Sequence, residues 1–122
     1  MNWRVKRLFP QCAALLILLF VSVAQIQGQT QAAMNAQARA EFEQADAELN
    51  KCYEALLTKL PDAEGKEKLK QSQRAWLVFR DAEAAFAADQ ARGGSMAATI
   101  CYETMKELNQ QRIKQLKLHL EE

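Results

Sequence analysis

The sequence predicts an all-α protein, in which an N-terminal signal peptide is followed by a three-helix bundle with up-down topology. Long stretches carry apolar residues at spacings of three and four, as one face of a helix requires, and no stretch alternates with the period of two that is typical of strands. Short breaks interrupt these stretches at Pro61 and at Gly93-Gly94. Short connections between long amphipathic helices imply that neighbouring helices run antiparallel.

The first 28 residues have the composition of a secretory signal peptide. They open with a basic region that consists of Arg4, Lys6 and Arg7. The uncharged apolar run that follows, residues 12–23, has about 12 residues and is too short for a helix to span a bilayer. We predict cleavage after Gly28, with Ala24 as the other candidate site and an uncleaved signal anchor as the alternative. Cys12 lacks the small residues that precede a lipoprotein cysteine, so no lipid anchor is predicted.

Residues 29–122 form the predicted exported domain, a single helical domain of 94 residues. Loss of the signal peptide lowers the number of basic residues from 16 to 13 and leaves all 15 acidic residues, so the net charge becomes about −2. No basic stripe interleaved with aromatic residues remains, which argues against nucleic-acid binding. The cleaved chain has no predicted membrane span, and we expect it in the periplasm or outside the cell.

The first helix of this domain is expected over residues 32–60. Its apolar positions have the spacing of one helical face and are Phe42, Ala45, Leu49, Cys52, Tyr53, Leu56 and Leu60. Pro61 ends the helix because proline disfavours the α conformation at the residue before it. Asp62 can then cap the next helix by accepting hydrogen bonds from its first amides.

Two further helices are expected over residues 64–91 and 96–119. The apolar face of the first of them is predicted to consist of Leu69, Trp76, Leu77, Phe79, Ala82, Ala85 and Phe86. The apolar positions of the last helix are Ile100, Met105, Leu108, Ile113, Leu116 and Leu120. In the connection, Gly93 and Gly94 permit positive φ and Ser95 is a candidate N-cap.

The most specific motif lies in the middle of the helix that is expected over residues 64–91. Residues 73–83 read QRAWLVFRDAE, which resembles the "aQraWlkyRdaE" signature of the LprI/YecT-type family. Weaker pieces of the family pattern are matched by Met34-Asn35, residues 47–53, Gly94-Ser95-Met96, Glu107-Leu108 and residues 112–116. Together these pieces cover nearly all of residues 29–122.

The LprI/YecT-type family takes its name from a mycobacterial lipoprotein described as a lysozyme inhibitor. The resemblance therefore implies an exported, non-catalytic envelope protein that inhibits a lysozyme-like muramidase, with no cofactor. Because similarity of fold is a weak guide to function, a structural or adaptor helical module that binds another envelope protein is the alternative. A third hypothesis is an envelope protein that associates with itself.

The exported domain keeps two cysteines, Cys52 and Cys101, and export makes a disulfide chemically feasible. Family members commonly have cysteines at positions that correspond to Gln37, Ala84 and Thr104 of this chain. In a simple hairpin register Cys101 is level with about Ala38, roughly 20 Å along the first helix from Cys52. Because a disulfide needs Cα atoms within about 7 Å, we predict two buried free thiols instead of a Cys52–Cys101 bridge. A shorter second helix or a shifted register would permit the bridge.

Polar side chains share a helix face with the tryptophan of the motif: Gln73, Arg80 and Glu83 lie on the same side as Trp76. Arg80 keeps its charge and needs acceptors, which Glu83 or a carboxylate from another helix would provide. The complete predicted set is Asn50, Tyr53, Gln73, Trp76, Arg80, Asp81, Glu83 and Arg112. This set is either a recognition site or an interhelical network that fixes the register of the helices, and we favour the network.

The candidate binding loop consists of Arg92, Gly93, Gly94 and Ser95. A lysozyme cleft presents two catalytic carboxyl groups, which a protruding loop with a cation and a hydroxyl donor would complement. The alternative, an ordinary turn between two helices, is the more common role of such a sequence.

Catalytic chemistry has little basis in this sequence. His119 is the single histidine, and its place near the C-terminus suits the last turn of a helix. One histidine without a cysteine cluster gives no zinc site, and Asp81 and Glu83 diverge around a helix because they are two residues apart. We therefore predict no enzyme activity and no metal site.

Overall fold

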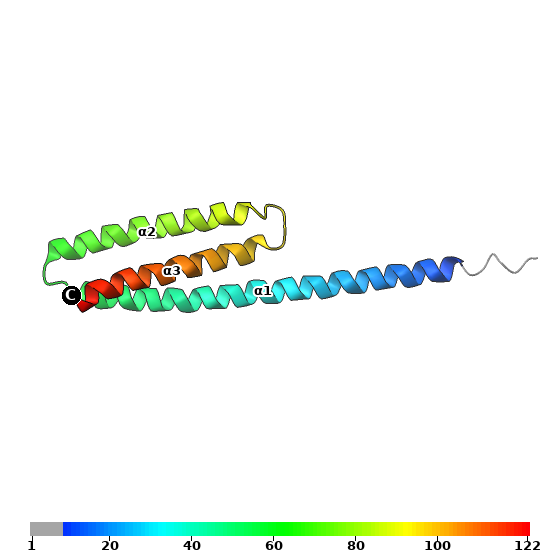
Figure 1. Cartoon of the computed structure of the whole chain (residues 1–122), viewed down its shortest axis with the longest axis horizontal. Coiled ribbons are helices and arrows are strands. Elements are labelled where there is room, and N and C mark those ends of the chain that lie inside the picture. The colour runs from blue at the N-terminus through cyan, green and yellow to red at the C-terminus, as the bar shows by residue number, and fades with distance from the viewer. Residues whose placement is uncertain (1–8) are drawn as a thin grey trace, which may run out of the picture. The chain divides into compact units, whose positions relative to one another are not determined.

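The chain forms three α-helices in a computed structural model: α1 (Phe9–Lys59), α2 (Ala63–Asp89) and α3 (Ala97–Glu121) (Figure 1). The structure describes the backbone of residues 9–122 and, among the side chains, those of Ile26, Gly28 and residues 30–122. No strand occurs in this described part of the chain, which confirms the all-α prediction. The chain divides into two compact units, Met1–Ala33 and Met34–Glu122, and the bundle is formed by the second unit.

The predicted signal peptide lies largely outside the residues that the structure describes, and its cleavage stays a prediction. The expected start of the first helix at residue 32 is wrong, because α1 begins at Phe9. The stretch from residue 24 to residue 40 is rich in alanine and glutamine and has no proline, so nothing in it ends a helix. Over the described part of the chain, none of the helices combines the length and the apolar character that a membrane crossing requires.

Within residues 34–122 the three helices run up, down and up (Figure 1), as the short connections predict. Two ion pairs show that α1 and α3 are parallel. The Nζ of Lys106 lies 2.7 Å from a carboxylate oxygen of Glu41, and the Nζ of Lys117 lies 2.8 Å from one of Glu48. α2 lies between α1 and α3 in the sequence and runs antiparallel to both.

The connections between the helices form as predicted at two positions and differ at a third. Asp62 caps α2 by accepting a hydrogen bond from the amide of Gly65 at 2.6 Å, and Gly93 has a φ of 75°. The prediction that Ser95 caps α3 is wrong, because Met96 occupies the N-cap position without a side-chain hydrogen bond. The chain enters α3 through a backbone turn instead, in which the carbonyl of Gly94 accepts from the amide of Ala97 at 3.5 Å.

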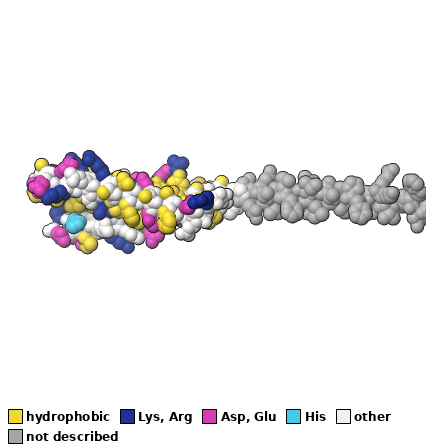
Figure 2. Space-filling view, turned by 90° about the horizontal axis from the view of Figure 1, so that it is seen from above, with side chains coloured by type: hydrophobic (Ala, Val, Ile, Leu, Met, Phe, Trp, Pro, Cys, Tyr) yellow, Lys and Arg dark blue, Asp and Glu magenta, His cyan; other side chains and the backbone are white. Residues whose placement is uncertain are grey.

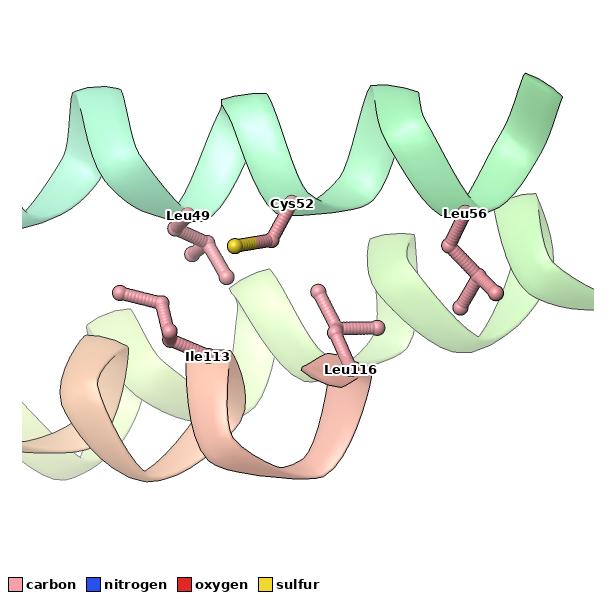
Figure 3. Packing of buried hydrophobic residues seen from close by; sticks show 5 residues of the cluster. All are labelled: Leu49, Cys52, Leu56, Ile113 and Leu116. Carbon is pink, nitrogen blue, oxygen red and sulfur yellow. The ribbon is translucent and has the colours of Figure 1, made fainter. Parts of the chain in front are cut away.

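The apolar core lies between α1 and α3 (Figure 3) and consists of Leu49, Cys52, Leu56, Ile113 and Leu116. All of these are apolar positions that the spacing predicted. Leu49 is 0% exposed and Leu116 is 1% exposed, and the two side chains come from opposite sides of the interface. Partly buried side chains complete the packing: Tyr53, Leu69, Trp76 and Leu120.

The face that α2 turns toward the bundle differs from the predicted one. Its buried residues are Gln73, Arg80 and Ala84, two of which are polar. The prediction is wrong for four residues that lie on the solvent side, Phe79, Ala82, Ala85 and Phe86. A count of apolar residues selects the wrong face here because the polar residues that point inward find hydrogen-bond partners on the other helices.

The ion pair between Glu41 and Lys106 makes the contact between α1 and α3 dependent on pH. The hydrogen bond from Lys106 lowers the pKa of Glu41 from its ordinary value of 4.5. A carboxyl group with a lowered folded-state pKa stabilises the fold above its unfolded-state pKa, and this stabilisation is lost as the pH falls through the folded-state value. We therefore expect the thermal unfolding midpoint to fall as the pH drops below about 4.5.

Circular dichroism melts from neutral to acidic pH would measure this loss in the parent chain and in Glu41→Gln. The variant should be less stable at neutral pH and should lose less on acidification. The same substitution at Glu54, an exposed carboxylate of α1, is the matched control and should leave the acid sensitivity unchanged. Equal pH profiles for the parent and Glu41→Gln would contradict the assignment.

Candidate functional site

Arg80 is the centre of a partly buried polar cluster to which all three helices contribute. The residue is 8% exposed. Its Nη1 donates to Oδ1 of Asp46 on α1 at 2.9 Å and to Oδ1 of Asn109 on α3 at 3.2 Å. Its Nε donates to Oδ1 of the adjacent Asp81 at 2.9 Å. We refer to Asp46, Arg80, Asp81 and Asn109 as the Arg80 cluster.

The side chains of Asp46, Arg80 and Asn109 are hydrogen-bonded to one another. Asn109 is 0% exposed, and its Nδ2 donates to Oδ1 of Asp46 at 3.2 Å while its Oδ1 accepts from Arg80. Within the described part of the chain, every buried side-chain nitrogen and oxygen atom has a hydrogen-bond partner. A satisfied network of this kind fixes the register of the helices, because a shift of one helix would leave buried donors or acceptors unpaired.

Trp76 lies close to two guanidinium groups. The Cζ of Arg80 is 5.6 Å from the centroid of the indole, and the Cζ of Arg112 is 5.9 Å from it. Arg80 also lies 5.4 Å from the ring centroid of Phe42 on α1. Cations within about 6 Å of an aromatic face are attracted by the ring quadrupole, so the aromatic rings hold charges that water reaches poorly.

Arg112 joins α3 to α2 at the edge of the core. Its Nε donates to Oε1 of Gln73 at 3.1 Å, and its Nη2 donates to the hydroxyl of Ser72 at 3.0 Å. Burial lowers the pKa of Arg112 from its ordinary value, although a guanidinium keeps its charge in proteins. Gln73 is 6% exposed, so its amide oxygen depends on this arginine for a partner.

The structure brings together most of the predicted polar set, but three of its members lie elsewhere. Asn50 and Glu83 are exposed to solvent, and Tyr53 packs against the apolar core instead. Asp46 and Asn109 supply the acceptors that Arg80 needs, and neither residue was predicted from the sequence. The signal for Asn109 was available, since it lies four residues before Ile113 and therefore on the same face of α3.

The loop between α2 and α3 lies at the end of the bundle opposite the C-terminus (Figure 1). Arg92, Gly93, Gly94 and Ser95 are all exposed. The guanidinium of Arg92 makes two hydrogen bonds to Asp89, from Nε to Oδ1 at 2.7 Å and from Nη2 to Oδ2 at 2.5 Å. This carboxylate raises the pKa of Arg92 from its ordinary value. The loop thus presents a cation that a carboxylate of the same chain already holds.

Cys52 and Cys101 are both free thiols in this structure, and the prediction that both are buried is wrong for Cys101, which is only half-buried. Cys52 packs with Ile113 in the core, and Cys101 precedes Ile113 by 12 residues on α3, which is roughly 18 Å along the helix. That separation exceeds the limit of about 7 Å between the Cα atoms of a disulfide. Burial, and to a lesser extent the charge of Asp81, raise the pKa of the Cys101 thiol. The thiol of Cys52 is buried and poorly accessible to reagents, so neither thiol is expected to react quickly at neutral pH.

Titration of thiols tests this prediction on the protein purified after export. We expect two free thiols for each chain in denaturant without reductant, and slow modification of both in the native protein. A single intramolecular bridge would instead give no free thiol before reduction and two after it.

His119 lies on the last turn of α3, as predicted, where its Nδ1 is 3.5 Å from a carboxylate oxygen of Glu122. Among the side chains that the structure describes, no group of three or more histidine, cysteine, aspartate or glutamate residues is arranged to hold a metal ion.

Residues 22–116 match the family described as lysozyme inhibitor LprI, a range that includes most of the bundle and the Arg80 cluster. The chain is also 32% identical over 96 residues to an uncharacterized protein of Rhizobium meliloti (strain 1021), and the match covers 69% of each chain. No solved structure gives a significant match. The signature around Trp76 and Arg80, and the match over most of the sequence, show that this chain belongs to the LprI lysozyme-inhibitor family.

Proposed function

We propose that this protein is exported to the periplasm or beyond the cell and there inhibits a lysozyme-like muramidase by binding it, without catalysis of its own. The match of residues 22–116 to the lysozyme inhibitor family is the observation that carries this proposal. The apolar run and basic start of the first 28 residues support export. The cleaved chain would act as a rigid helical scaffold that presents a binding surface.

The loop that contains Arg92 and Ser95 is the part of the bundle that we propose for contact with the enzyme. In enzymes of the lysozyme type, an ionised carboxylate and a protonated carboxyl group flank the scissile bond. A guanidinium can pair with such a carboxylate through two parallel hydrogen bonds. Arg92 already makes this kind of contact with Asp89, so insertion into the cleft would exchange one carboxylate for another.

The competition between Asp89 and the enzyme gives a sharp test of the loop. Titration of lysozyme activity on cell walls should show inhibition by the purified protein, weaker inhibition by Arg92→Ala and stronger inhibition by Asp89→Asn, which releases Arg92. Arg39→Ala is the matched control, because Arg39 makes a similar exposed ion pair with Glu43 at 2.8 Å on another helix. Equal potency of all four proteins would remove the loop from the proposal, and no inhibition by the parent chain at stoichiometric excess would reject the function for that enzyme.

The adaptor alternative has its own support in the structure. α2 exposes large apolar side chains to solvent, with Val78 at 72%, Phe79 at 51% and Phe86 at 68%. Contiguous exposed apolar surface commonly marks an interaction site. A pull-down from envelope extract that recovers one partner and no muramidase, and that depends on Phe79, would favour the adaptor.

A further inference from the structure

The outer side of α2 carries a continuous apolar stripe. Its members are all exposed and are Ala75, Val78, Phe79, Ala82, Ala85 and Phe86. At 3.6 residues per turn these six positions fall within an arc of about 120°. The centre of the arc is on the opposite side of the helix from the buried residues Gln73, Arg80 and Ala84. We refer to it as the outer stripe.

Figure 2 looks from above, on the side of the bundle where α2 lies in Figure 1, and shows hydrophobic side chains gathered over the middle of this face. Phenylalanine and valine exposed to this degree lose favourable burial energy unless something covers them. The alanines between them are small enough for the backbone of a second helix to approach closely. The stripe therefore has the shape and composition of a helix–helix interface that lacks its second helix.

The charges along α2 indicate which kind of helix could pack against the outer stripe. Residues 64–74 contain four basic and two acidic residues, whereas the exposed charges of residues 75–89 are the carboxylates of Asp81, Glu83 and Asp89. A parallel neighbour of the same sequence would place like charges side by side. An antiparallel copy of α2 would place its acidic half beside the basic half of the first, which electrostatics favours.

We propose that two copies of this chain associate through their outer stripes, with the two α2 helices antiparallel across a two-fold axis that passes between Val78 and Phe79. In this register Phe79 is level with the partner's Val78 and Ala75 with the partner's Ala82. Lys68 is level with the partner's Asp89. Arg74 lies on the same flank as the partner's Asp81, about 3 Å from level. Such an interface is self-complementary, as a two-fold axis requires.

This inference is independent of the proposed inhibition, because the outer stripe runs along the side of α2 and the candidate binding loop lies at the end of the bundle, whereas an adaptor partner would compete with the second copy for the outer stripe. The dimer would present two such loops. Binding of an enzyme molecule to either loop, or to neither, would leave the contact between the two outer stripes unchanged. Failure of either proposal leaves the other standing.

Sedimentation velocity of the protein purified after export tests the association, at chain concentrations from about 1 to about 100 μM, the range in which weak and moderate complexes dissociate. A reductant keeps Cys52 and Cys101 from linking copies. We expect a species with twice the mass of the chain, and a monomer for Phe79→Ser. Leu118→Ser is the matched control, since Leu118 is 62% exposed on α3, and this variant should remain dimeric. Arg74→Glu, which alters a charge beside the stripe and no apolar contact, should weaken association at least several-fold.

Single cysteines test the orientation. Val78→Cys should form a disulfide between copies under mild oxidation, whereas Gln71→Cys should not, because the antiparallel register separates its two copies by roughly 22 Å along the helix axis. Linking at both positions would overturn the antiparallel arrangement. A monomer at every concentration would overturn the proposal, even if the stripe binds another protein. A dimer that Phe79→Ser leaves intact would also overturn it.

Discussion

Replacement of Arg80 by leucine is expected to destabilise the bundle by about 1–3 kcal/mol, the usual cost of leaving a buried polar group without its hydrogen-bond partner. The change leaves the carboxylate of Asp46 and the amide oxygen of Asn109 without their shared donor, and Asn109 has no access to water that could take its place. Urea unfolding followed by circular dichroism would measure the loss. Because the three partners come from three helices, we expect the whole domain to lose stability in one transition.

A second variant of Arg80 separates its charge from its shape, and a variant of Arg39 is the control. Arg80→Lys keeps the positive charge but cannot donate from Nε and both terminal nitrogens, so it should recover only part of the loss. Arg39→Leu, the control, removes an exposed arginine that pairs with Glu43, and should cost much less stability than Arg80→Leu. Equal losses for Arg80→Leu and Arg39→Leu would show that the cluster contributes little to stability.

Replacement of Leu116 by alanine is expected to cost about 2–5 kcal/mol. Leu116 is 1% exposed and packs between Leu49, Cys52 and Leu56, so the substitution removes methyl groups and leaves a cavity that helices tied by the Arg80 cluster cannot readily close. Thermal and urea unfolding should both report the loss. Leu118→Ala, two residues away on the exposed side of α3, should change stability by about 0.5 kcal/mol or less. Similar losses at the two positions would mean that α3 is rotated from the orientation described here.

The helices and the apolar core were largely predictable because both follow from local spacing. Positions such as Leu49, Leu56, Ile113 and Leu116 repeat at intervals of three and four, and Pro61 and Gly93 end the stretches for simple conformational reasons. The start of α1 was not predictable in this way, since its sequence has no breaker near residue 32. The prediction of signal-peptide cleavage depends on the composition of residues 1–28, and the spacing of apolar residues in the helices does not test it.

The rotation of α2 and the partners of Arg80 could not be predicted from spacing alone. A pattern method assigns polar residues to water, so Gln73 and Arg80 count against the face that is in fact buried, and Phe79 and Phe86 count for the face that is exposed. The correct orientation depends on hydrogen bonds to Asp46 and Asn109, which are 34 and 29 residues away from Arg80 in the sequence. Only a three-dimensional arrangement reveals that these groups satisfy one another.

The position of Trp76 close to two arginines gives the protein a built-in optical reporter. The chain has two tryptophans, and the other, Trp3, belongs to the segment that the predicted cleavage removes. After export, the ultraviolet-excited emission would come from a single indole that has the guanidinium groups of Arg80 and Arg112 within 6 Å of its ring centroid. A shift in emission wavelength on mutation, acidification or enzyme binding would then register rearrangement at this one place, without any attached dye.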